Sequence, residues 1–136
     1  MKLTIAILAA LAATFIIPVC PAVNTGKPIV KKFKVTAYCP CAKCCGKSDR
    51  ITASGHKLKY GDSIAAAGKK YPFGTKLFIP GYGPAIVKDR GGAITDDCID
   101  VIFYEKSPRP DMNDLEYSHA LAKKWGVRFM DVEIYE

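Results

Sequence analysis

Glycine and proline pairs divide the later part of the chain into short apolar stretches, and this spacing constrains the fold more than any other feature. Turn-forming runs occur at 71–74 (Tyr-Pro-Phe-Gly), 80–83 (Pro-Gly-Tyr-Gly) and 91–92 (Gly-Gly). The segments between them, 75–79 and 84–88, are rich in apolar residues. Short segments bounded by turn signals are typical of β-strands, whereas helices need about ten or more residues. The sequence therefore predicts a mainly β protein.

Further strands are expected on both sides of this region. Residues 33–38 alternate, with Phe33, Val35 and Ala37 on one face, and residues 63–67 form another short apolar run. Residues 127–135 alternate again and predict a closing strand. Many short strands without internal repeats favour one small β-barrel domain over a doubly wound α/β fold, which needs more helices.

One helix is expected near the C-terminus. Asp111 or Asn113 can cap its start, and Gly126 can end it. Its buried face would carry the apolar residues that recur at helical spacing, Leu115, Ala122 and Trp125.

The N-terminus resembles a secretory signal peptide. Met1-Lys2 precedes an apolar run over 3–19, and Cys20-Pro21-Ala22 ends it with a small residue. We therefore expect a signal peptide over 1–22, a flexible linker over 23–32 and a domain over 33–136. A retained membrane anchor is the alternative, although the run is at the short limit for a spanning helix.

Loss of the signal peptide on export would leave a basic chain, and its charge indicates the kind of partner it binds. Removing residues 1–22 takes away one of the 20 basic residues and none of the 13 acidic residues, so 19 basic residues remain and the net charge is +6. A basic exported protein is drawn to anionic surfaces such as cell-wall polymers. No zinc-finger spacing, basic helix or ribonucleoprotein motif is present, so nucleic acid is not expected as a partner.

Cysteines are concentrated in one loop. The mature chain has five, which we take as disulfide candidates because export favours oxidation: Cys39, Cys41, Cys44, Cys45 and Cys98. We expect one loop cysteine to bridge to Cys98, with at least one thiol left over. A zinc knuckle is an alternative use of the loop thiolates. A cysteine nucleophile paired with His56 or His119 is another.

Two aspartates lie in the stretch 88–103, which predicts a strand, a glycine turn and a second strand. Asp100 falls on a mostly apolar strand face, where a carboxylate is costly unless it is paired or functional. Gly91-Gly92 lets the chain turn and leaves space for a ligand. We expect Asp89 and Asp100 to line one cleft; a loop aspartate and a capping aspartate are the alternative.

The ordered set of motifs resembles the three-aspartate (3D) domain of bacterial cell-wall proteins, related to the catalytic domain of the membrane-bound lytic transglycosylase A family. The resemblance runs from about 33 to 135 and rests on these segments: Thr36-Ala37-Tyr38, Thr52-Ala53-Ser54-Gly55, Pro72-Phe73-Gly74-Thr75-Lys76, Gly81-Tyr82-Gly83, Asp89-x-Gly91-Gly92-Ala93-Ile94, Ile99-Asp100-Val101 and His119-Ala120-x-Ala122-x-x-Trp125-Gly126.

This resemblance implies a small six-stranded double-psi β-barrel with one late α-helix. It also implies cleavage of the peptidoglycan glycan strand. Asp89 matches the second family aspartate and Asp100 the third, which is taken as catalytic, but Ala67 stands where the first belongs. Repulsion between carboxylates helps to keep one of them protonated. With Ala67, that task passes to Asp89 and to burial.

The resulting expectation is a lytic transglycosylase that acts on the MurNAc-β-1,4-GlcNAc bond and leaves 1,6-anhydro ends. A non-catalytic wall-binding domain and a glycan hydrolase with two aspartates are the alternatives. Substrate contacts are expected at Tyr38, Thr52, Gly91 and Gly92. No metal or cofactor is expected. We expect a monomer that is secreted or cell-wall associated, encoded by a bacterium or its phage, and bound to glycan strands.

Overall fold

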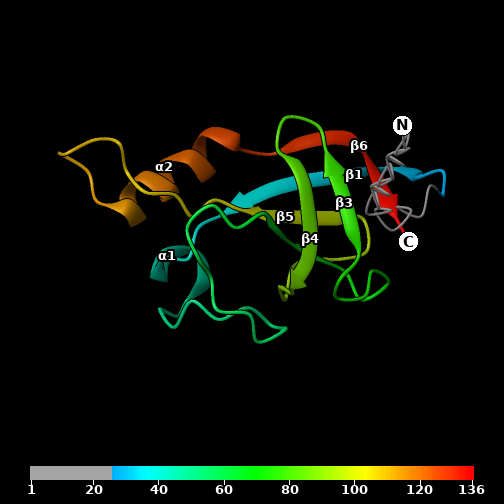
Figure 1. The fold of residues 1–136 in the computed structure, drawn as a ribbon, viewed down its shortest axis with the longest axis horizontal. Coiled ribbons are helices and arrows are strands. Elements are labelled where there is room, and N and C mark those ends of the chain that lie inside the picture. Colours follow the sequence, from blue (N-terminus) through cyan, green and yellow to red (C-terminus); the bar gives the residue numbers. More distant parts are fainter. Residues whose placement is uncertain (1–25) are drawn as a thin grey trace, which may run out of the picture.

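The structure is a computed structural model that describes residues 26–136, and its six strands close into a barrel with two helices beside it (Figure 1). The elements in chain order are β1 (Ile29–Tyr38), α1 (Ala42–Cys45), β2 (Ile64–Ala67), β3 (Lys76–Ile79), β4 (Gly83–Asp89), β5 (Cys98–Ile102), α2 (Asp114–Trp125) and β6 (Arg128–Tyr135). The predicted mainly β, six-stranded barrel with a late helix is confirmed. The single turn of α1 was not predicted.

The strand order around the barrel is β1-β5-β2-β4-β3-β6. β1 pairs with β5 and β2 pairs with β4 in parallel, and the other neighbours are antiparallel. A register shift between Ala65 and Ala66 interrupts the pairing of β2 with β4. Such a bulge bends the strand and re-aims side chains. Here it brings Ala66 opposite Asp89 on β4.

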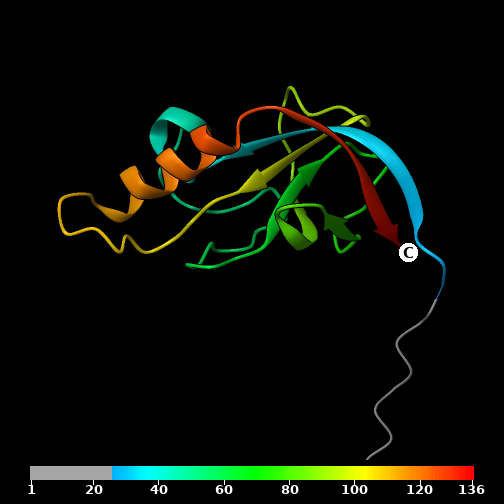
Figure 2. The same cartoon turned by 90° about the horizontal axis from the view of Figure 1, so that it is seen from above.

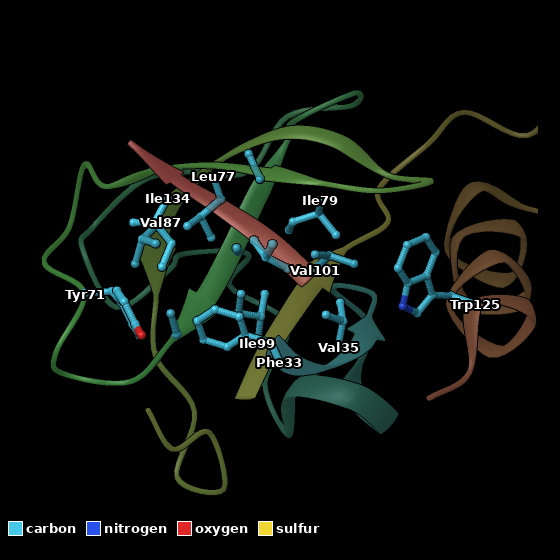
Figure 3. Close-up of a cluster of buried hydrophobic side chains, with 14 residues drawn as sticks. Phe33, Val35, Tyr71, Leu77, Ile79, Val87, Ile99, Val101, Trp125 and Ile134 are labelled. Atoms are coloured by element: carbon cyan, nitrogen blue, oxygen red, sulfur yellow. The ribbon is translucent and has the colours of Figure 1, made fainter. Parts of the chain in front are cut away.

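Alternating side chains of the short strands fill the barrel (Figure 3). Phe33 and Val35 of β1 meet Ile99 and Val101 of β5, and all four are almost fully buried. Burial of each such side chain contributes about 1.5–3 kcal/mol to folding. Trp125 of α2 packs against one end of this core. The helix is thereby fixed to the barrel.

α2 begins at a capping box. The side chain of Asn113 accepts a hydrogen bond from the backbone N–H of Glu116, whose carboxylate accepts one from the backbone N–H of Asn113. Of the two predicted caps, Asn113 is the one used. Ser118 is buried, donates to the carbonyl of Glu105 and accepts from its N–H. These contacts fix the position of the helix next to the strand ends.

β1 begins four residues earlier than predicted, at Ile29. The extra residues pair with β6, for example Ile29 with Ile134, so residues 29–32 belong to the barrel instead of the expected linker. The predicted signal peptide over 1–22 lies outside the described residues. No helix within 26–136 has the length and apolar character needed to cross a membrane.

Candidate functional site

Asp89 and Asp100 lie on opposite sides of β2. Asp89 is the last residue of β4, and Asp100 is the middle residue of β5. Ala66 of β2 is in register with both of them. Neighbouring strands lie about 4.8 Å apart, so the two backbones are separated by about 10 Å. The barrel therefore brings together the two aspartates that the sequence singled out.

Asp100 is largely enclosed. It is on the strand face outside the barrel core, next to a second apolar cluster composed of Tyr38, Leu58, Ile64, Ile102 and Tyr104. Burial raises the pKa of the Asp100 carboxyl above its ordinary value, and the charge of Asp89 raises it further. A hydrogen bond of 2.9 Å from the Thr36 hydroxyl to Oδ1 acts in the opposite direction. On balance Asp100 holds a proton more tightly than an ordinary aspartate.

Three donors orient the carboxylate of Asp89. The Tyr38 hydroxyl donates to Oδ2 at 2.7 Å, and the backbone N–H groups of Ala53 and Arg90 donate to Oδ1 at 2.8 and 2.9 Å. Hydrogen bonds to a charged acceptor are stronger than those between neutral groups. Asp89 is therefore held in one orientation.

Tyr38 and Thr52, two of the predicted substrate contacts, are both buried. Tyr38 is only 8% exposed, and burial, followed by the hydrogen bond to Asp89, raises the pKa of its hydroxyl far above the usual value. Thr52 is 4% exposed; its hydroxyl accepts from the N–H of His56 and contacts Ser54. Tyr38 thus contacts Asp89 directly, whereas Thr52 holds the turn that contains the Ala53 donor. Their predicted contact with a sugar stays a prediction.

The two glycines lie at the surface beside Asp89. Gly91 and Gly92 are both exposed. A Cβ atom on Gly91 would come within 2.8 Å of the Ile94 side chain, whereas one on Gly92 would meet nothing within 4 Å. Gly91 therefore allows a close approach within the turn, and Gly92 leaves open space above it.

The position of the missing first aspartate is closed. Ala67 is 1% exposed and belongs to the barrel core. Its carbonyl accepts a hydrogen bond from Arg90 Nη1 at 3.1 Å, and Arg90 Nη2 donates to the carbonyl of Tyr71 at 2.7 Å. Arg90 was not among the predicted site residues, since no pattern in the chain shows where its guanidinium points.

Neither of two cavities found within residues 26–136 is lined by both Asp89 and Asp100. A small cavity of about 30 Å³ is lined by Asp89 together with Tyr38, Cys45 and other residues, but not by Asp100. This volume suits about one or two water molecules. A larger cavity of about 700 Å³ lies on β3 and β4, near the side chains of Phe78 and Ile86, and includes neither aspartate. The expectation that both carboxylates line one cleft stays a prediction.

The cysteines are not paired as predicted. All five cysteines within residues 26–136 are free, so the expected disulfides are absent there. Cys98 accepts a hydrogen bond from the Thr95 hydroxyl and is in register with Lys34, far along β1 from Cys39. The structure therefore does not confirm the predicted bridge from the loop to Cys98. Three loop cysteines instead surround His119 of α2.

Residues 62–109 match the family model of the 3D domain. The chain carries a 3D domain. The match includes the positions of Ala67, Asp89 and Asp100, and it confirms the resemblance inferred from the motifs. The cysteine loop and α2 lie outside the matched residues.

Two relatives from Bacillus subtilis (strain 168) extend the similarity of this 3D-domain chain. One is named as a cell wall shaping protein, YabE, and is 36% identical over 114 residues, which cover 82% of this chain and 24% of the relative. The other is the cell wall-binding protein YocH, 33% identical over 107 residues, covering 76% of this chain and 32% of the relative. The chain thus spans 24% and 32% of the lengths of these two relatives.

Proposed function

We propose that this 3D domain cleaves the glycan strand of peptidoglycan as a lytic transglycosylase, with Asp100 as its single acid and base. The observation that carries the proposal is the raised pKa of an enclosed Asp100 close to a second, fixed carboxylate, Asp89. A general acid must keep its proton near the working pH, and burial with a neighbouring like charge is how proteins achieve this. The names of the two relatives support the bacterial cell wall as the site of action.

In the proposed reaction, protonated Asp100 donates to the glycosidic oxygen of the MurNAc-β-1,4-GlcNAc bond as the bond to the MurNAc anomeric carbon breaks. The resulting carboxylate takes the proton of the MurNAc 6-hydroxyl, whose oxygen bonds to the same carbon. The products are a free GlcNAc 4-hydroxyl and a 1,6-anhydro end. Asp100 finishes protonated, and no water is consumed.

The arrangement of Asp89 favours this scheme over hydrolysis. A hydrolase needs a second carboxylate as base or nucleophile. Both oxygens of Asp89 already accept hydrogen bonds from the protein, from Tyr38 and from the backbone of Ala53 and Arg90. Asp89 is therefore better suited to hold its charge near Asp100 than to activate water. The sugar supplies the nucleophile in a transglycosylase, so one acid–base residue suffices.

Wall binding without cleavage is the second candidate. Ala67 in place of the first family aspartate and the small volume at Asp89 both favour it. A glycan strand would then lie across the exposed surface at Gly91 and Gly92. The name of YocH as a cell wall-binding protein agrees with this candidate.

Product analysis separates these functions. Purified protein is incubated with peptidoglycan sacculi, and the soluble muropeptides are separated and identified by mass spectrometry. The proposal predicts 1,6-anhydro products that disappear in Asp100→Asn and persist in Asp111→Asn, which changes an exposed aspartate paired with Arg109. Reducing ends would indicate a hydrolase. Retention on sacculi without any soluble product would establish the wall-binding function instead.

A further inference from the structure

The loop after β1 and the helix α2 bring three sulfur atoms and one imidazole together. Cys39, Cys41 and Cys44 come from the loop, and His119 comes from α2, at least 75 residues further along the chain. Their ligand atoms all lie within 4.8 Å of one another. Only the fold can produce such a convergence, because the imidazole is remote in sequence from the thiols.

The distances match a tetrahedral zinc site. Nδ1 of His119 lies 3.6, 3.6 and 3.5 Å from the sulfur atoms of Cys39, Cys41 and Cys44. Tetrahedral coordination with ordinary Zn–S and Zn–N bonds places sulfur and nitrogen ligands about 3.6 Å apart, and two sulfurs about 3.8 Å apart. Cys39 and Cys44 are separated by 3.5 Å, close to that value. Cys39 and Cys41, at 2.8 Å, would have to separate by about 1 Å.

The local backbone holds the thiols in place. α1 is one helical turn in which the N–H groups of Cys44 and Cys45 donate to the carbonyl of Cys41. Gly46 ends the turn with φ +65°, a left-handed conformation that favours glycine. The thiol of Cys45 points away from the cluster and donates to the carbonyl of Cys39. The turn thus directs one of two adjacent cysteines into the cluster and the other out of it.

We propose that Cys39, Cys41, Cys44 and His119 bind one Zn²⁺ ion as a structural site. Four protein ligands leave no open position for water or substrate, which is the pattern of structural and not catalytic zinc. Binding requires that the three thiols lose their protons to solvent and that Nδ1 of the imidazole is unprotonated. Three thiolates, one neutral imidazole and Zn²⁺ give the site a net charge of −1.

The ion would join α2 to the end of β1. Figures 1 and 2 show α1 beside α2 at the same end of the barrel. Cys39 directly follows Tyr38, whose hydroxyl holds Asp89. The site would therefore stabilise the support of Asp89 without taking part in the glycan chemistry, and it is independent of whether the domain cleaves or only binds its substrate.

Metal titration of the reduced protein tests the proposal. The full chain is kept reduced with a phosphine, freed of metal and titrated with Zn²⁺ against a chromophoric chelator, and in parallel with Co²⁺. We expect one ion per chain and cobalt absorption bands typical of tetrahedral thiolate coordination. Cys44→Ser and His119→Asn should each weaken Zn²⁺ binding by more than about 100-fold, the upper end of the cost of losing an outer-shell partner.

Matched controls give the test its specificity. Cys45→Ser removes a thiol that lies next to Cys44 in sequence but outside the cluster. Cys98→Ser removes a thiol on β5. Both variants should bind Zn²⁺ like the wild type. Circular dichroism shows whether each variant is folded. If Cys44→Ser is not folded, His119→Asn provides the test of ligand loss. Substoichiometric binding, equal loss in Cys45→Ser, or unchanged affinity in His119→Asn would overturn the proposal. So would isolation from the exported protein of a metal-free form with a disulfide among Cys39, Cys41 and Cys44.

Discussion

The hydroxyl of Tyr38 donates a hydrogen bond of 2.7 Å to Oδ2 of Asp89. This contact joins the end of β1 to the end of β4, two strands that are not neighbours in the barrel. Because Cys39 follows Tyr38 immediately, the same segment connects the aspartate site to the cysteine loop. The position of Asp89 therefore depends on how firmly the end of β1 is held.

Removing this hydroxyl tests that dependence. Tyr38→Phe leaves Asp89 with its two backbone donors but removes a hydrogen bond to a charged acceptor, which costs about 1.5–3 kcal/mol of stability. We expect urea unfolding to show a loss in this range and muropeptide release to fall by about tenfold or more. Tyr82→Phe is the control, since Tyr82 donates at 2.7 Å to the neutral carbonyl of Ile102. It should cost only about 1 kcal/mol and leave activity unchanged. Equal effects of both variants on activity would contradict the role of Tyr38.

The hydroxyl of Thr36 should set the pH range of the reaction. It donates to the carboxylate form of Asp100, so it lowers a pKa that burial and Asp89 raise. Thr36→Val removes this donor, and the pKa of Asp100 should rise further. The protonated form then persists to higher pH, and the alkaline limb of the profile of kcat/KM against pH should move upward. A limb that stays in place or moves downward would show that Asp100 is not the group that titrates.

Asp100→Asn should abolish activity while leaving the folded protein at least as stable as the wild type. The folded protein binds the Asp100 proton more tightly than the unfolded chain, so stability falls as pH rises from 3.8, the ordinary value of an aspartate, through the raised pKa in the folded state. The amide carries no charge and avoids this loss. We expect Asp100→Asn to be at least as stable as the wild type at pH 7, with the difference shrinking towards pH 3.8, as measured by thermal unfolding across this range. A variant that is less stable at pH 7 would argue for a structural role of the carboxylate.

Introducing the first family aspartate at Ala67 should destabilise the folded chain. Ala67→Asp would place a carboxylate in the barrel core, where an unpaired charge costs several kcal/mol. We expect a loss of about 3 kcal/mol or more and no gain in activity. Ala93→Asp introduces the same side chain at an exposed position and should change stability by less than about 0.5 kcal/mol. Higher activity in Ala67→Asp at unchanged stability would mean that the position opens onto the site.

The sequence predicted those parts of the fold that depend on local patterns. Turn residues at 80–83 and 91–92 separated strands that exist, and Asn113 caps the helix as its spacing indicated. The start of β1 was missed because residues 29–32 form a strand only by pairing with β6. Pairing between distant strands leaves no mark on the periodicity of either one.

The site was predictable in its aspartates but not in their partners. A carboxylate on an apolar strand face identified Asp100. The Thr36 hydroxyl that donates to Asp100 and the Tyr38 hydroxyl that donates to Asp89 follow instead from register and side-chain direction. The surroundings of Cys98 likewise depend on strand register. In the parallel pair of β1 and β5, Cys98 aligns with Lys34, which lies about 13 Å along the strand from Tyr38. Export and cysteine count alone carry no information about this separation.

The proton affinity of Asp100 is the central claim, and nuclear magnetic resonance measures it directly. The carboxyl carbon of Asp100, labelled with carbon-13, is titrated in the wild type and in Asp89→Asn. We predict a midpoint above 3.8 in the wild type and a lower midpoint in Asp89→Asn, because a neighbouring negative charge has been removed. A wild-type midpoint at or below 3.8 would contradict the account.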